Sequence, residues 1–216
     1  MNVLNSYQNN KFLSDYEMSK RFVNNTYEKD EIDLINCIPN IKKFAVIELG
    51  GGLGVTSTIV NKKLYNKEDH VVVEANPNIL PYLKYNKFVN NCEFKIFPGI
   101  VGNNNVFYSY DKIIAGSSHR KDNREKNKKK HLVTNIKYKD FLKIYNINPD
   151  LCIVDIEGGE LEFLQHLYLF KKLKYLVLEI HEGLMYTGFK KECIDVIKKH
   201  NGKLIRHLGY TYLFYF

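Results

Sequence analysis

Short apolar runs alternate with amphipathic stretches along most of the chain. The runs are apolar over nearly their whole length, which is typical of strands that are buried on both faces of a parallel sheet. The predicted strands are FAVIEL (44–49), HVVVEA (70–75), EFKIF (93–97), LCIVDI (151–156) and KYLVLEI (174–180). Between them, apolar side chains recur at the spacing of an amphipathic helix. The predicted helices are 26–38, 55–65, 78–86, 159–172 and 189–200.

The end of the chain departs from this alternation. KLIRHL and TYLFYF flank Gly209, which predicts an antiparallel hairpin. NVFYSY (105–110) predicts one further small strand. Strands that alternate with helices indicate an α/β fold, here a mostly parallel sheet with an antiparallel C-terminal edge and helices on both faces. We expect one domain over residues 1–216, in which the polar residues 1–25 form an arm or a loose helix.

Charge is concentrated in one segment. The chain has 32 basic and 24 acidic residues, and seven basic residues against two acidic ones lie between Arg120 and Lys130. This basic insertion (112–131) interrupts the predicted sheet, and its part from 116 to 131 has no apolar residue with which to pack a core. It could be a lid over a substrate, with Ser117, Ser118 and His119 at its base touching the ligand. It could also contact phosphate groups of a nucleic acid, or be a solvated loop.

Cysteine usage and hydropathy suggest the compartment. The four cysteines are scattered without a C-x-x-C pair, which argues against a disulfide framework or a zinc knuckle. The polar N-terminus has no apolar signal core, and no stretch approaches the length of a membrane span. We therefore expect a soluble, cytoplasmic protein.

Four glycines follow the first strand within five positions, at Gly50, Gly51, Gly52 and Gly54. A strand, a glycine turn and a helix form a backbone cradle at a helix N-terminus. The third glycine of the dinucleotide pattern G-x-G-x-x-G would fall at Val55, so a nicotinamide cofactor fits less well. Glu48 precedes the glycines, and a carboxylate there suits a cationic ligand. S-adenosylmethionine, which carries an ammonium and a sulfonium group, is the predicted cofactor.

Other strand ends supply the rest of a cofactor site. Glu74 ends the second strand, where a carboxylate can accept hydrogen bonds from both ribose hydroxyls of an adenosine. Ala75 and Asn76 follow it directly and are expected to contact the same ligand. Gly99 and Ile100, just past the third strand, are expected to frame the adenine.

Acids and a histidine end the next two strands and are candidates for chemistry. Asp155 is expected to reach the sulfonium side of the cofactor or the hydroxyl of an acceptor, and Glu157 to touch the acceptor. Glu179 and His181 are two residues apart, so both face one side of an extended segment. Glu179 could then orient the imidazole, and His181 could accept the hydroxyl proton as a general base while contacting the acceptor.

These motifs in order resemble a known family. VIELGGGLGVTS, VVVEANPN, FPGIVGNNN, DLCIVDIEGGELEFLQHL and LVLEIH are together similar to the FkbM family of S-adenosylmethionine-dependent methyltransferases, over roughly residues 27–181. The resemblance implies a seven-stranded Rossmann-like fold and O-methylation, often of sugar or natural-product hydroxyls. It also implies that Tyr27-Glu28 is the family's Y-E pair, with Glu28 on the cofactor side.

The chain departs from the family pattern at two places. Glycines stand where D-x-G-A-N-x-G has alanine and asparagine, and Ile153 stands where the family often has lysine, so a role of that lysine does not carry over. Two alternatives stay open. Asp155, Glu179 and His181, with Glu157 beside them, could hold a divalent cation, although none is expected. The acceptor, expected to be a small molecule or a glycan, could instead be an RNA ribose 2′-hydroxyl approached through the basic insertion.

Overall fold

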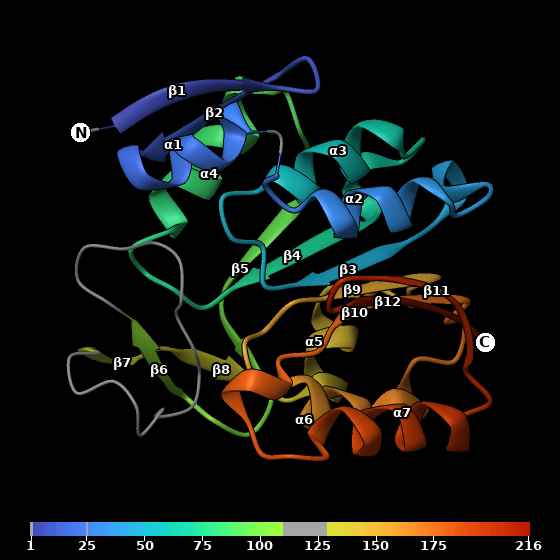
Figure 1. Cartoon of the computed structure of the whole chain (residues 1–216). Coiled ribbons are helices and arrows are strands. Elements are labelled where there is room, and N and C mark those ends of the chain that lie inside the picture. Colours follow the sequence, from blue (N-terminus) through green and yellow to red (C-terminus); the bar gives the residue numbers. More distant parts are fainter. Residues whose placement is uncertain (1, 25, 110–128) are drawn as a thin grey trace.

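The computed structural model describes residues 2–24, 26–109 and 129–216. An eight-stranded sheet runs through the centre, with helices on both faces (Figure 1). In sheet order its strands are β11 (Lys203–Leu208), β12 (Thr211–Tyr215), β10 (Tyr175–Glu179), β9 (Leu151–Val154), β3 (Val46–Leu49), β4 (His70–Glu74), β5 (Lys95–Val101) and β8 (Thr134–Ile136). β12 is antiparallel to both neighbours, and the other pairs are parallel. The predicted mostly parallel, Rossmann-like sheet with an antiparallel C-terminal edge is confirmed.

The sheet has one strand more than the seven that the family resemblance implied. The additional strand, β8, is only three residues long and pairs with the end of β5, from Gly99 opposite Thr134 to Val101 opposite Ile136. Its sequence, TNI, contains no apolar run, so periodicity alone did not reveal it. The predicted strand at 105–110 is present as β6 (Val106–Ser109), which forms a separate antiparallel ribbon with β7 (Lys129–Leu132).

Helices cover the sheet in two layers (Figure 1). Those of one layer are α2 (Lys29–Asn36), α3 (Val55–Lys63) and α4 (Leu80–Val89), and those of the other are α5 (Tyr138–Ile144), α6 (Glu160–Leu164) and α7 (Phe189–Lys199). Short 3₁₀ helices are η1 (Ile41–Lys43), η2 (Lys67–Asp69), η3 (Leu167–Leu169) and η4 (Glu182–Leu184). The predicted helix 159–172 is therefore divided into α6 and η3, and α5 was not predicted.

The central strands are buried on both sides, as their apolar runs predicted. On β3, Ile47 and Leu49 pack toward α5, α6 and α7, whereas Val46 packs with residues of α2 and α3. Glu48 alternates with Ile47 and Leu49, so it points to the same side as Val46. No helix in the described part of the chain combines the length and the apolarity that crossing a bilayer requires.

The N-terminal residues are more ordered than the predicted arm or loose helix. They form an antiparallel hairpin of β1 (Asn2–Tyr7) and β2 (Asn10–Asp15), followed by α1 (Tyr16–Val23). Phe12, Phe22 and Tyr27 stack in a small core under the hairpin. The prediction failed because the segment is rich in asparagine and lysine and shows little apolar alternation.

Two asparagine side chains, one in α4 and one directly after it, attach the hairpin to the domain. The amide of Asn86 accepts from Leu13 N at 2.6 Å and donates to Leu13 O at 3.1 Å. Asn90 forms the same pair of bonds with Lys11, at 3.0 and 2.6 Å. Asn86 also donates to Leu53 O at 2.8 Å, in the glycine loop. The two amides thus satisfy backbone groups of β2 that a neighbouring strand would otherwise pair.

Candidate functional site

A cavity of about 730 Å³ opens at the carboxyl ends of the parallel strands. It lies where the chain order reverses between β3 and β9, because β3 leads to β4 on one side and β9 to β10 on the other. Ligands of open α/β sheets bind at this switch point. The residues that line it come from the loops after β3, β4, β9 and β10 and from the segment around α2. The sequence had placed the site at this edge of the sheet.

The four glycines divide into two roles. Gly50 and Gly52 line the cavity, and their φ angles of +91° and +51° lie in the region that glycine adopts most readily. A Cβ on Gly50 would lie 1.7 Å from the carbonyl oxygen of Asp155, so the loop passes against the strand end of β9. Gly51 and Gly54 instead allow close packing, because a Cβ would meet Val72 at 2.3 Å and Leu83 at 2.6 Å respectively.

Glu48 does not reach the cavity, contrary to the predicted cofactor contact. Its side chain is buried, accepts a hydrogen bond from Ser57 Oγ at 2.7 Å and lies 3.1 Å from His70 Nε2. The residues that line the cavity do not include it. The alternation along β3 gives the reason, since Glu48 points toward α3 and β4 rather than toward the loop.

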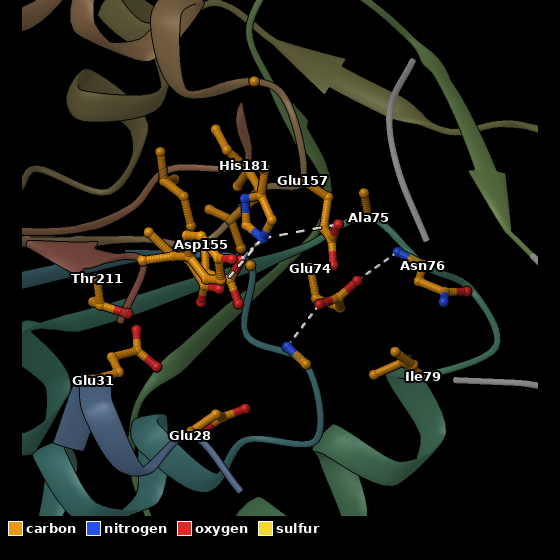
Figure 2. A pocket seen from close by; sticks show the side chains of 18 of the residues that line it. Glu28, Glu31, Glu74, Ala75, Asn76, Ile79, Asp155, Glu157, His181 and Thr211 are labelled. Atoms are coloured by element: carbon orange, nitrogen blue, oxygen red, sulfur yellow. Dashed lines mark hydrogen bonds and ion pairs between the residues drawn. The ribbon is translucent and has the colours of Figure 1, made fainter. Parts of the chain in front are cut away.

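Glu74 lies at the cavity floor in the predicted position. Its Oε2 accepts from Gly52 N at 2.7 Å and its Oε1 from Asn76 N at 2.6 Å (Figure 2). Burial raises the pKa of Glu74 to about 7 despite these hydrogen bonds. Ala75 provides a third backbone hydrogen bond to this carboxylate, which leaves at least one lone pair for a ligand hydroxyl. Ala75, Asn76, Gly99 and Ile100 line the cavity as well, as predicted, and Ile79 and Val101 add apolar surface.

Two acids from the segment around α2 face the cavity opposite the tips of β9 and β10. Glu28 has a φ of +49°, a left-handed conformation that is uncommon outside glycine and concentrates at functional sites. Its carboxylate lies next to Gly52. Glu31, one helical turn further, is buried and lines the same cavity. The family resemblance pointed to Glu28. Glu31 was missed, although its spacing of three residues from Glu28 is the signal that could have found it.

Asp155, Glu157, Glu179 and His181 come together, as the sequence predicted. His181 Nε2 lies 3.5 Å from Asp155 Oδ1, 3.9 Å from Glu157 Oε2 and 3.6 Å from Glu179 Oε1. Figure 2 shows the imidazole facing Asp155 and Glu157 at the mouth of the cavity. Three carboxylates therefore surround one imidazole nitrogen.

The carboxylate that orients His181 is Glu160, not the predicted Glu179. Glu160 is fully buried, and its Oε1 accepts from Gly158 N at 3.0 Å and lies 2.6 Å from His181 Nδ1. By its place at the start of the predicted helix 159–172, Glu160 has the local pattern of a first-turn helix acid. The turn before α6, with φ of +50° at Glu157 and +100° at Gly158, directs Glu160 inward rather than to solvent.

This environment changes the expected chemistry of His181. Burial alone would lower its pKa, but the hydrogen bond to Glu160 and the charges of Asp155 and Glu157 raise the pKa of His181 to about 10. The imidazole is then protonated near neutral pH, a state in which it cannot accept a proton, so the role of general base stays a prediction that this environment does not favour. Burial and the charge of Glu179 raise the pKa of Asp155 well above its usual range, although His181 lowers it.

A metal would need a different protonation state. One ligand atom each of Asp155, Glu157 and His181 lie within 4.8 Å of one another, a set that overlaps the predicted Asp155, Glu179 and His181. A histidine must lose its proton from the ligating nitrogen before it can bind a metal. Without a metal, a protonated imidazole supplies positive charge among these carboxylates. The predicted substrate contacts Ser117, Ser118 and His119, and most of the basic insertion, lie outside the described residues.

The residues present fit S-adenosylmethionine. Glu74 can accept a ribose hydroxyl, and Gly50 and Gly52 leave room for close approach of a ligand to the loop backbone. Glu28 and Glu31 offer carboxylates to an ammonium group. The acids at the tips of β9 and β10 lie where a positive sulfonium would be favoured.

Comparisons with known proteins agree with this picture. The methyltransferase FkbM domain matches residues 30–212 of the chain. A search of curated proteins finds no match. Similar solved structures include a putative S-adenosylmethionine-dependent methyltransferase from Streptococcus mutans, with a TM-score of 0.56 and 9% identity, where the alignment covers 99% of this chain and 54% of that one.

Two further structures share the fold. The ribosomal protein L11 methylase of Lactobacillus delbrueckii subsp. bulgaricus has a TM-score of 0.51 and 8% identity, covering 86% of this chain and 74% of that one. A putative RNA methyltransferase from Pyrococcus horikoshii has a TM-score of 0.50 and 16% identity, covering 88% and 83%. At these identities the likeness concerns the fold alone.

Proposed function

Because the chain belongs to the FkbM methyltransferase family, we propose that it transfers the methyl group of S-adenosylmethionine to a hydroxyl group of a sugar or glycan. The family and the methyl donor are given by the match over residues 30–212. The proposal concerns the acceptor and the atom that is methylated.

The observation that carries this proposal is the group of carboxylates around His181. Asp155, Glu157 and Glu179 all lie within 4 Å of one imidazole nitrogen, at 3.5, 3.9 and 3.6 Å. Ionised carboxylates only accept hydrogen bonds, so the partners that suit them carry donors. A sugar offers several neighbouring hydroxyl donors, whereas a simple alcohol offers one. A sugar therefore uses this group of acceptors more fully.

The same charges weigh against a nucleic-acid acceptor. The basic groups of the lining are Arg21, Lys29 and the imidazole of His181. The carboxylates of the lining are Glu28, Asp30, Glu31, Glu74, Asp155, Glu157, Glu162 and Glu179. Phosphate groups of an RNA would meet repulsion here, and each like-charge contact costs binding free energy. No described contact favours the RNA alternative.

Asp155 is best suited to take the hydroxyl proton. Its carboxylate stands at the strand end beside Gly50, and a bound sulfonium would favour its ionised form, which can accept the proton, against the burial that raises its pKa. His181 stays protonated and holds the carboxylates in place, while Glu160 fixes the ring through Nδ1. When bound, the donor supplies an electrophilic methyl group on a positively charged sulfur. Alignment by these rigid strand ends can lower the barrier by roughly 7–11 kcal/mol.

The test is a methyl-transfer assay with labelled donor on neutral glycans, amines and RNA at equal concentration. We expect label in the glycan fraction, recovered as a methyl ether. Asp155→Asn should lower kcat by a factor of about 10² to 10⁴ and leave the affinity for S-adenosylhomocysteine within a few-fold. Asp30→Asn, at the edge of the same cavity, serves as the matched control. Label found only in RNA or amines, or an active Asp155→Asn enzyme, would refute the proposal.

A further inference from the structure

Glu28 and Glu31 are linked through one hydroxyl group. Thr56 Oγ1, in the first turn of α3, lies 2.8 Å from Glu28 Oε2 and 2.9 Å from Glu31 Oε2. Both distances are those of hydrogen bonds. Thr56 N also donates to Glu28 Oε2 at 2.9 Å. Figure 2 shows both carboxylates on the same side of the pocket, with Glu31 between Glu28 and Thr211.

The hydrogens in this linkage must be counted. A threonine hydroxyl has one hydrogen to donate, and an ionised carboxylate has none. If both acids were ionised, only one of the two short contacts could hold a well-directed hydrogen. The other would place two oxygens with lone pairs facing each other in a buried site, which is costly. A second proton, carried by one of the two carboxyls, satisfies both contacts at once.

The surroundings favour retention of that proton. Burial raises the pKa of Glu28 to about 7, against the hydrogen bonds from Thr56. Burial and the charge of Glu28 raise the pKa of Glu31 well above its usual range. The groups that face the pair from neighbouring elements are Tyr27, Glu48 and Asp155, with Arg21 beside Tyr27. Two of these four, Glu48 and Asp155, are carboxylic acids whose charge opposes two negative charges at the pair, whereas Tyr27 is uncharged near neutral pH.

We propose that Glu28 and Glu31 together form the binding site for the ammonium group of the methyl donor, and that the proton they share through Thr56 is released to solvent when that group binds. This rests on the proposed function, because it needs the donor in this cavity. An ammonium group has three N–H donors and one positive charge, so it can replace both the hydrogen and the charge of the shared proton. Glu31 then binds the methyl donor directly, through its ammonium group.

Proton linkage gives the expected behaviour. A proton that competes with the ligand weakens binding at low pH, so the affinity should rise with pH through the range in which the pair loses this proton and then level off. The number of protons released should be close to one while the free protein still holds the shared proton and should fall toward zero once that proton is lost. A ligand that has the adenosine part but no ammonium group should release none.

Calorimetry measures this release directly. S-adenosylhomocysteine is titrated into the protein of residues 1–216 at pH 6.5 in buffers of different ionisation enthalpy. The slope of observed heat against ionisation enthalpy gives the number of protons released. We expect about one proton per ligand for the wild-type protein. 5′-Methylthioadenosine, which lacks the amino-acid group, should bind with a slope near zero. Glu31→Gln should bring the slope for S-adenosylhomocysteine close to zero and weaken its binding.

The outcomes separate the inference from its premise. If S-adenosylhomocysteine binds with no proton release in the wild-type protein, or if Glu31→Gln releases as much as wild type, the inference is overturned and the donor site stands. If neither ligand binds the wild-type protein, the donor site itself is overturned and the inference with it. Binding of 5′-methylthioadenosine to Glu31→Gln with unchanged affinity shows that the variant is folded.

Discussion

The charge state of His181 can be tested by replacing the acid that orients it. Glu160→Gln keeps the shape of the side chain and an oxygen that can accept from Gly158 N and from the imidazole, but it removes the negative charge 2.6 Å from Nδ1. The imidazolium then loses its charge-assisted hydrogen bond while Asp155, Glu157 and Glu179 remain on the other side of the ring. The pKa of His181 should fall.

The size of the effect follows from the wild-type value. A rise in the pKa of His181 from 6.5 to about 10 corresponds to about 5 kcal/mol of stabilisation of the charged form. A hydrogen bond to a charged group contributes roughly 1.5–3 kcal/mol, which is about one to two pKa units. The pKa of His181 in Glu160→Gln should therefore lie near 8 to 9.

The same shift predicts how stability depends on pH. The folded-state pKa of His181 is above the unfolded value, so its contribution to the free energy of unfolding is complete below about pH 6.5 and is lost as pH rises through about 10. About 5 kcal/mol is the upper limit of that loss, because His181 is partly exposed and solvent screens part of its interaction with the carboxylates. Glu160→Gln should narrow the pH range over which the loss occurs.

The assay is an NMR titration of the histidine ring signals, with His181→Gln to assign the peak, joined to urea unfolding at pH 6.5 and 10.5. Glu162→Gln is the matched control, since this acid is on the same helix but accepts from Asn103 N. A wild-type His181 that titrates near 6.5, or an unchanged titration in Glu160→Gln, would refute the reasoning and restore the histidine as a candidate base.

Three further outcomes are expected. Gly50→Ala should abolish ligand binding and lower the free energy of unfolding by more than about 2 kcal/mol, because its Cβ would lie 1.7 Å from the carbonyl oxygen of Asp155. The control Gly183→Ala has open space around its Cβ, so its free energy of unfolding in urea should stay within about 0.5 kcal/mol of the wild-type value. Asn86→Ala should lower the free energy of unfolding by about 3 kcal/mol, near 1 kcal/mol for each of three hydrogen bonds. It should also speed hydrogen exchange at the Leu13 amide, and unchanged exchange there would contradict this prediction. A chelator should leave methyl transfer unchanged, because the imidazolium already supplies positive charge among the carboxylates. Loss of activity with the chelator and its restoration by added Mg²⁺ would contradict this prediction.

The sequence located the sheet and one edge of the site because these depend on strong local signals. Short, fully apolar runs most often form buried strands, and four glycines after such a run indicate a tight turn at the strand end. The acids Glu74, Asp155 and Glu179 could be placed together because parallel strands end at one edge. None of these inferences needed a side-chain direction.

The failures all depended on direction or on weak patterns. Glu48 was placed in the cavity because its position beside the glycines was known but the side of the sheet it faces was not. Glu160 looked like a solvent-facing helix acid, and only the left-handed turn at Glu157 directs it inward. Glu31 was missed because its place in the site depends on tertiary contact with Thr56, and its spacing of three residues from Glu28 was a weak local signal.

The Asn86 amide of α4 has a practical consequence for anyone preparing this protein. Asn86 bonds both to β2 and to the carbonyl of Leu53, next to the glycines that border the cavity. Deletion of the first fifteen residues would remove β2, so the Asn86 amide would bond to solvent instead. Its hydrogen bond to the Leu53 carbonyl in the glycine loop would then be weaker. A shortened protein could then fold but bind its ligand with reduced affinity. Affinities should therefore be measured on the whole chain.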